Sequence, residues 1–548
     1  MAKFTALLLL ALVCLVAQTH AYSLNGMKCV ACTAGFEIAI NYLKLHPQPI
    51  NQFVEQHLCE LFNEPLMKSI CHRFVNAFGD MIAVFLLQKL SSDEICTRFT
   101  ICKNNPTCRL HPMGVVQSRI LEAQQDLKLG GRLEPLLLLN DPWDILKGIY
   151  ETLAIDHKPL RILDIDGDSF STIETLRGTH WKGRDCNDLD ADIYPGRKVN
   201  PYPGKDEDYN CNGIVGTDPQ TNLSWKEQLC ANTTQYGIAV IGDSFGAHFH
   251  IPESWINASM INTNTYQNLI TKTLDEFDLP HKSAVTGYEE SSPSSPVRSL
   301  YKRMLERNRC NHRDYQNVAV NGGDSNDTVV NLKALKRNQT TDNPMLVVME
   351  LIGNDVCHYP QEYTPANYFK DALIGRLEYL DTVLPNGSHV ILLGLVNGSE
   401  LYNYLENEMH PLGVHYPAFY DFLACQKASP CPGWLTSNKT LRDLATKYAM
   451  EINQEYKKFM AEKRVYKHFD YDYYEIPGKE ITDAYVAKGG SVKDIIESVD
   501  GFHPTQIFHA LFADWMWETL EKEHPDWLGE VNPNNQKIIE LFGNQGGY

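Results

Sequence analysis

The chain has 548 residues, enough for two to four domains and at least one large apolar core. Its formal net charge of −19 argues against a basic face for phosphates, so nucleic acid is not an expected partner. There are 15 cysteines, and setting aside Cys14 leaves an even number, as disulfide pairing in an oxidising compartment requires.

The first predicted element is a cleavable signal peptide over residues 1–21. Lys3 gives a basic start, residues 7–16 form a continuous apolar run, and Thr19-His20-Ala21 offers a cleavage site. No later uncharged apolar run reaches the ~18 residues that a spanning helix needs. We therefore expect a protein of the secretory pathway, secreted or lysosomal-vesicular. Predicted N-glycosylation sites are Asn222, Asn232, Asn257, Asn338, Asn386, Asn397 and Asn438.

Residues 22–110 combine six cysteines with apolar helical stretches. Helices are expected over residues 36–45, 53–62 and 81–90, with prolines only at the breaks. Cys29-x-x-Cys32 is not read as a zinc site, because no second close pair of Cys or His is suitably placed.

The order and spacing of these cysteines resemble those of the saposin domain, an all-α module that opens an apolar inner face toward lipid. The resemblance implies contact with a membrane or micelle surface, and the apolar run 82–87 favours this over an ordinary closed core. It also implies three nested disulfides, Cys29–Cys102, Cys32–Cys96 and Cys59–Cys71.

Residues 111–155 are expected to be a connector. Gly130-Gly131-Arg132 indicates a site of proteolytic processing, with an ordinary linker as the alternative. Cys108 is left over if the six preceding cysteines close among themselves, so it must pair elsewhere or stay free. A disulfide from Cys108 to the last domain would keep two processed chains linked. Cys425 and Cys431 are both candidate partners.

Residues 156–220 are rich in hard oxygen ligands and lack apolar periodicity, so a metal is expected to replace a core. Asp and Asn recur at alternate positions in three runs, a spacing that lets a loop wrap a cation; an acidic solvated linker is the alternative. The runs lack the Gly and Glu positions of an EF-hand and resemble instead the Asp-rich repeats of thrombospondin-type modules. Predicted ligands are Asp164, Asp166, Asp168, Asp185, Asn187, Asp190, Asp192, Asp206, Asp208, Asn210 and Asn212.

The metal expected in this calcium-binding loop region is structural Ca²⁺, in more than one copy. Mg²⁺ is less suited because it tolerates irregular cages poorly. A catalytic role is not expected, since no His joins the ligands. A Cys186–Cys211 disulfide is expected to tie two of the loops together.

Residues 221–548 alternate apolar strands with helical stretches, which predicts an α/β domain with a central parallel sheet. Strands are predicted over residues 238–241, 318–320, 346–352 and 390–396. The first three end in small polar residues. Because the carboxyl ends of parallel strands share one sheet edge, the three turns are expected to converge there.

Ser244, in the first of these turns, is the candidate nucleophile. It needs a base, which His503 supplies, and Asp500 can hold the imidazole in the right tautomer. The backbone N–H groups of Ser244 and Gly323 and the side-chain amide of Asn354 are candidate oxyanion donors. The sequence 242–246 also fits the G-x-S-x-G of α/β-hydrolases. There, however, the serine follows several strands and the Asp and His lie apart.

Four blocks of the domain resemble, in order, those of the GDSL (SGNH) hydrolase family. They are Gly242-Asp243-Ser244, Asn321-x-Gly323, Asn354-Asp355 and Asp500-x-x-His503. Phe245 departs from the usual Leu or Ile, and Ile352 stands where the family has Gly. The resemblance implies an ester hydrolase with a serine, histidine and aspartate triad.

The order of the three modules resembles the acyloxyacyl hydrolase family over essentially the whole mature chain. This implies removal of secondary fatty acyl chains from the lipid A of bacterial lipopolysaccharide, through an acyl-enzyme, by two disulfide-linked chains cut from one precursor. Two alternatives are a broader phospholipase or lysophospholipase and a non-catalytic lipid-transfer protein. The intact triad argues against the second.

Overall fold

The computed structural model describes residues 24–47, 59, 68, 72, 82, 85–86, 90–99, 101–105, 107–111, 164–174, 177–325 and 332–548. The predicted signal peptide lies outside these residues, as does the connector after His111 with its proposed processing site. Most of the two helices predicted over 53–62 and 81–90 also lies outside them.

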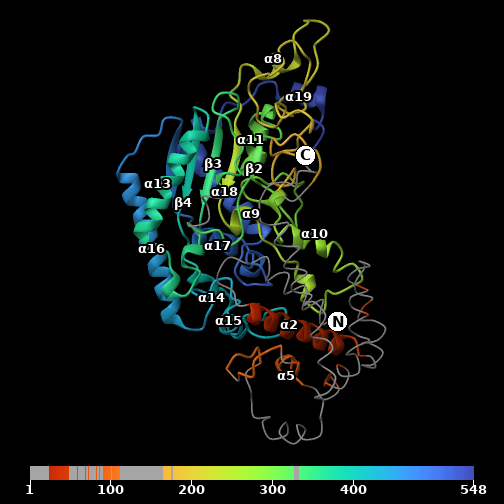
Figure 1. Cartoon of the computed structure of the whole chain (residues 1–548), viewed down its shortest axis with the longest axis vertical. Helices are drawn as coiled ribbons and strands as arrows, with labels where there is room; N and C mark the ends of the chain where they lie inside the picture. The colour runs from red at the N-terminus through yellow and green to blue at the C-terminus, as the bar shows by residue number, and fades with distance from the viewer. Residues whose placement is uncertain are drawn as a thin grey trace, which may run out of the picture.

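A five-stranded sheet forms the centre of the hydrolase region (Figure 1), and each neighbouring pair of strands is parallel. The strand order is β2-β1-β3-β4-β5. The chain passes from β1 to β2 on one side and then to β3 on the other, which creates a topological switch point beside β1. The strands are β1 (Gly237–Ile241), β2 (Tyr315–Asn317), β3 (Met345–Glu350), β4 (Ser388–Leu393) and β5 (Phe469–Tyr474).

Helices of very different length accompany this sheet. They are α8 (Trp225–Cys230), α9 (Ser244–Ala247), α10 (Leu269–Leu274), α11 (Leu300–Arg307), α13 (Ala366–Val383), α14 (Ser399–Leu405), α15 (Tyr416–Cys425), α16 (Lys439–Ala461), α17 (Gly478–Ala487), α18 (Gln506–Glu523) and α19 (Asn535–Phe542).

The side chains of the sheet alternate between two apolar clusters, because successive residues of a strand point to opposite faces. On β3, Met345, Val347 and Met349 pack with α13 and α16, whereas Leu346 and Val348 pack with α11 and α18. The hydrolase region is therefore a three-layer α/β/α sandwich, which confirms the predicted class and its central parallel sheet.

The strands differ from prediction at two places. The strand predicted over residues 318–320 lies three residues earlier in the structure, as β2. The N–H groups of residues 318 and 320 still donate to the carbonyl oxygens of Val240 and Gly242, so this segment continues alongside β1. β5 was not predicted. It alternates Asp and Tyr rather than forming an apolar run, because it is an edge strand with only its first residue fully buried.

The saposin-like region contributes helices α2 (Leu24–Leu45) and α5 (Ser92–Arg98) to the described structure. Disulfides join Cys29 to Cys102 and Cys32 to Cys96, the pairs that the resemblance implied. Cys59 is disulfide-bonded, but Cys71, its expected partner, lies outside the described residues.

Helix α2 lies between its own module and α15 of the hydrolase region (Figure 1). Every residue from 29 to 39 is buried, and the apolar cluster around them continues into the hydrolase core. A Cβ added to Gly26 would lie 1.7 Å from the carbonyl oxygen of Gln426, so this close approach requires glycine. The two regions share one packed interior rather than touching through a linker alone.

Disulfides also organise the rest of the chain. Cys108 pairs with Cys425, which resolves the choice of partner that the sequence left open. No helix or strand lies in the described residues between 164 and 224, where a Cys186–Cys211 bridge joins two loops. The remaining described pairs are Cys230–Cys310 and Cys357–Cys431.

Within the ranges given above, no helix combines the length and apolar character needed to cross a membrane.

Candidate active site

Ser244 lies where β1 meets the short helix α9. All residues of β1 are buried, and the chain turns sharply after it. A Cβ added to Gly242 would lie 1.9 Å from Glu350 Oε1, so the turn requires glycine. Asp243 caps α9, because its Oδ1 accepts the N–H of Phe245 at 2.8 Å. The turn therefore presents Ser244 at the carboxyl edge of the sheet, beside the topological switch point.

The loop before α18 brings His503 against Ser244. Ser244 Oγ is 2.9 Å from His503 Nε2, and His503 Nδ1 is 2.6 Å from Asp500 Oδ2. Burial acts to raise the pKa of Asp500, but the charge and hydrogen bonds of His503 outweigh it and leave that pKa below its ordinary value. Asp500 is thus a carboxylate, and Nδ1–H must donate to it. The Nε2 lone pair is left to accept the Ser244 proton.

The two other predicted oxyanion groups lie on neighbouring turns. A Cβ added to Gly323 would lie 3.1 Å from Gly242 O, so this turn packs against the nucleophile turn. The Gly323 N–H donates to Val320 O at 2.9 Å, however, which engages it within its own turn. Asn354 Nδ2 donates to Gly323 O at 3.1 Å and keeps a second N–H for another acceptor.

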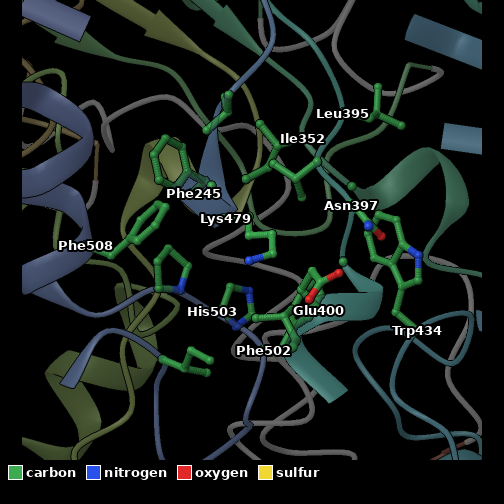
Figure 2. A pocket seen from close by; sticks show the side chains of 18 of the residues that line it. Phe245, Ile352, Leu395, Asn397, Glu400, Trp434, Lys479, Phe502, His503 and Phe508 are labelled. Carbon is green, nitrogen blue, oxygen red and sulfur yellow. The ribbon is translucent and has the colours of Figure 1, made fainter. Parts of the chain in front are cut away.

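A pocket of about 340 Å³ opens beside Ser244 and His503 (Figure 2). Figure 2 shows the side chains of Glu400 and Lys479 pointing into the same space as His503. The walls are mostly apolar, which suits an apolar ligand held next to a few polar groups. The apolar lining residues are Phe245, Ile352, Leu395, Val396, Leu401, Trp434, Met450, Ile476, Ile495, Ile496, Phe502, Pro504 and Phe508.

The sequence of this chain is similar to those of known proteins. Residues 238–516 match the GDSL-like Lipase/Acylhydrolase family, and residues 69–102 match Saposin-like type B, region 2. The acyloxyacyl hydrolase of Oryctolagus cuniculus is 36% identical over 95% of this chain and 93% of its own. Those of Mus musculus and Homo sapiens are each 36% identical over 96% of this chain and 94% of theirs.

The chain belongs to the acyloxyacyl hydrolase family. It is therefore a carboxylic ester hydrolase whose saposin-like and lipase regions mark it as a lipid esterase. The resemblance predicted from the module order and the four sequence blocks is confirmed.

Carboxylates between residues 164 and 188 form a candidate metal site. Oxygens of Asp164, Asp166 and Asp188 lie within 4.8 Å of one another, as do those of Asp166, Asp168 and Asp185. One buried oxygen on each of Asp166, Asp168 and Asp185 has no hydrogen-bond partner. Burial raises the pKa of Asp168 to about 8 and that of Asp185 to about 6. A hard cation such as Ca²⁺ would coordinate these oxygens and offset the cost of burying them, so the residues suit such a metal ion.

Asp188 is the member of this cluster that sequence reasoning missed. Its Oδ1 accepts the N–H of Ile165 at 3.0 Å and so joins the first acidic run to the second. Its place two residues before Asp190, within the same acidic run, is the sequence signal that could have found it. Its contact with residues 23 positions away could be found only from the fold.

The carboxylates of the other predicted aspartates do not join these two groups. Asp192 pairs with Arg197 at 2.9 Å, and Asp190 Oδ2 accepts from the hydroxyl of Tyr202 at 2.5 Å. The N–H of Asn187 donates to Asp185. The third predicted run makes contacts with its own backbone instead, through Asp206, Asp208 and Asn212, and one buried oxygen of Asn210 has no partner.

The predicted glycosylation sites are accessible to different degrees. Asn257 is half-buried and donates to Glu253 Oε1 at 2.6 Å. Asn397 lies at the wall of the active-site pocket. The exposed sites are Asn222, Asn232, Asn338, Asn386, Asn397 and Asn438.

Glu350, the last residue of β3, is a second group that sequence reasoning missed. It is fully buried beneath the nucleophile turn, where Oε1 accepts the N–H of Asp243 at 2.9 Å and that of Gly246 at 2.8 Å. Burial, and next the charge of the nearby Asp243, raise its pKa well above the ordinary value. A lone carboxyl within the apolar run 345–352 is the signal that could have found it.

Proposed function

We propose that this lipid esterase releases secondary fatty acyl chains from the lipid A of bacterial lipopolysaccharide. The observation that carries the proposal is the apolar pocket at the buried Ser244–His503–Asp500 chain, whose serine and histidine are 8% and 9% exposed. The names of the relatives and the saposin-like region beside the hydrolase region support the same substrate. Such a site can hold an acyl chain away from water while its ester meets the nucleophile.

The proposed reaction begins when Ser244 Oγ attacks the ester carbonyl and His503 Nε2 takes its proton. Asp500 holds the imidazole and stabilises its positive charge. The Ser244 N–H and the Asn354 amide donate to the oxyanion; Gly323 can join them only by releasing Val320 O. His503 then gives this proton to the leaving alkoxide oxygen, so that the lipid departs with a free hydroxyl group. Water, deprotonated by the same imidazole, attacks the acyl-enzyme, releases the fatty acid and restores the serine.

We propose that the carboxylate cluster holds Ca²⁺ in a structural role. The carboxylates that would hold Ca²⁺ form two groups that share Asp166, and binding would fix two loops whose described residues contain no helix or strand. They are Asp164, Asp166, Asp168, Asp185 and Asp188. No step of the ester chemistry is assigned to the metal.

We also propose four mature modules, over residues 22–110, 111–155, 156–220 and 221–548. Cleavage in the second module would leave two chains held by the Cys108–Cys425 disulfide. The described disulfides are typical of proteins that fold in the oxidising secretory pathway. We propose that the saposin-like region meets the lipid surface, be it a membrane or a micelle.

The test compares the acids freed from lipopolysaccharide with those freed from phospholipid vesicles. We expect the wild type to release secondary acyl chains, Ser244→Ala to release none while staying folded, and Ser294→Ala, which changes an exposed serine, to match the wild type. Release by purified Ser244→Ala would overturn the mechanism. Equal release from phospholipids would favour the broader phospholipase.

A further inference from the structure

The docked helix α2 of the saposin-like region contacts a tight turn of the hydrolase region. Asn41 Nδ2 donates to Leu412 O at 3.0 Å. The turn closes on itself, because the N–H of His410 donates to Val414 O and the N–H of Gly413 donates to His410 O, both at 2.8 Å. A change in how α2 sits on this turn therefore acts on the turn as a unit.

His410 connects the same turn to the catalytic loop. Its Nδ1 accepts the N–H of Leu412 at 3.2 Å, and its Nε2 lies 2.9 Å from Val499 O. A carbonyl can only accept, so Nε2 must carry the proton, and the side chain links the two segments as a neutral imidazole. His410 is almost fully buried and stacks on Phe419, with ring centroids 3.8 Å apart, which fixes its orientation.

Two tyrosines of α15 hold the same loop. The hydroxyl of Tyr416 donates to Ser498 O at 2.7 Å, and that of Tyr420 donates to Gly501 O at 2.8 Å. A Cβ added to Gly501, whose φ is +62°, would lie 2.3 Å from the Tyr420 hydroxyl oxygen, so the loop packs closely against this tyrosine and requires glycine there. Together with His410, these side chains bind the carbonyls on both sides of Asp500.

We propose that docking of α2 positions the catalytic loop, with His410, Tyr416 and Tyr420 as positioning residues. The hydrogen-bonded path runs from Asn41 through the turn to the carbonyl that precedes Asp500. The saposin-like region thus regulates turnover at the active site as well as capturing lipid. This inference rests on the proposed function of the Ser244 site.

Small shifts of the catalytic loop should affect the rate because each member of the triad meets the next through a single hydrogen bond. Asp500 orients His503 through one contact of 2.6 Å, and His503 meets Ser244 through one of 2.9 Å. A displacement of about 1 Å in such an arrangement can cost on the order of 100-fold in rate. Losing one hydrogen bond of the path moves the loop by less, so we expect about a five- to tenfold loss in kcat with KM unchanged.

The experiment uses the full chain and p-nitrophenyl butyrate, a short ester that needs no lipid capture. Asn41→Leu and Tyr420→Phe should each lower kcat about five- to tenfold. Gln426→Leu is the matched control for Asn41→Leu: it loses another hydrogen bond between the regions, to Cys108 O, but makes no bond to the path. It should stay within about twofold of the wild type.

Two further variants separate positioning from folding. Tyr471→Phe removes a hydroxyl of β5 that donates to Arg464 O and makes no bond to the catalytic loop, so it should leave kcat unchanged. His410→Gln keeps a donor for Val499 O and should retain more activity than His410→Leu at equal thermal stability.

An unchanged kcat in Asn41→Leu would overturn this inference alone, as would a loss seen only with lipopolysaccharide and not with the short ester. Fatty-acid release by Ser244→Ala in the parallel assay would instead overturn the proposed function. A raised KM with unchanged kcat would also overturn the inference, because it would mean that α2 only helps to bind substrate.

Discussion

Replacing Glu350 tests whether this buried carboxyl holds the nucleophile turn. Glu350→Leu leaves the N–H groups of Asp243 and Gly246 without their acceptor. Each buried unsatisfied group costs about 1–3 kcal/mol, so the free energy of unfolding should fall by about 2–6 kcal/mol. Glu350→Gln keeps an acceptor oxygen and should lose much less. Urea unfolding followed by tryptophan fluorescence, with the disulfides intact, measures both values.

The free energy of unfolding of the wild type should also depend on pH through Glu350. The pKa of Glu350 is raised in the folded protein, so above the ordinary Glu pKa of about 4.3 the folded state holds a proton that the unfolded chain releases. The wild type therefore loses stability through this group as pH rises toward the folded pKa, by up to about 1.4 kcal/mol per pH unit.

Glu350→Gln lacks this loss, so its stability relative to the wild type should rise steadily from pH 5 to pH 7. Asp243 titrates together with Glu350, so its change is part of the measured difference, whereas titrating groups away from this pair are common to both proteins and cancel. A constant difference across this range would show that the carboxyl is ionised in the folded state and would refute the reasoning.

Three further predictions concern the rest of the molecule. Asp500→Asn should lower kcat by about 10⁴-fold, since the amide favours the wrong tautomer of His503; steady-state kinetics showing a loss below tenfold would contradict this. Removing Ca²⁺ with a chelator should lower the melting temperature, and Asp168→Asn should abolish that shift in scanning fluorimetry; equal shifts in both proteins would exclude Asp168 as a ligand. After cleavage in the connector, Cys108→Ser should release two chains on non-reducing gels, where the wild type stays as one band; a single band in the variant would contradict the tether.

The sequence predicted Ser244, Asp500 and His503 because each lies in a short motif whose chemistry depends on neighbours along the chain. It predicted the parallel sheet because buried strands are continuous apolar runs. It could not show that the Gly323 N–H is engaged by Val320, because that depends on how one turn closes. Glu350 and Asp188 were missed for a related reason: their roles come from groups that only the fold brings near.

The Cys108–Cys425 disulfide lies at one end of α15, the helix whose other end carries Tyr416. A tether of this kind makes docking of the lipid-binding module an intramolecular event, with an effective concentration in the millimolar range. The non-covalent surface between the modules can then be weak, because a module that lifts off to take a lipid returns without diffusing away. Reduction of this one bond in a cleaved enzyme would make the same association depend on protein concentration.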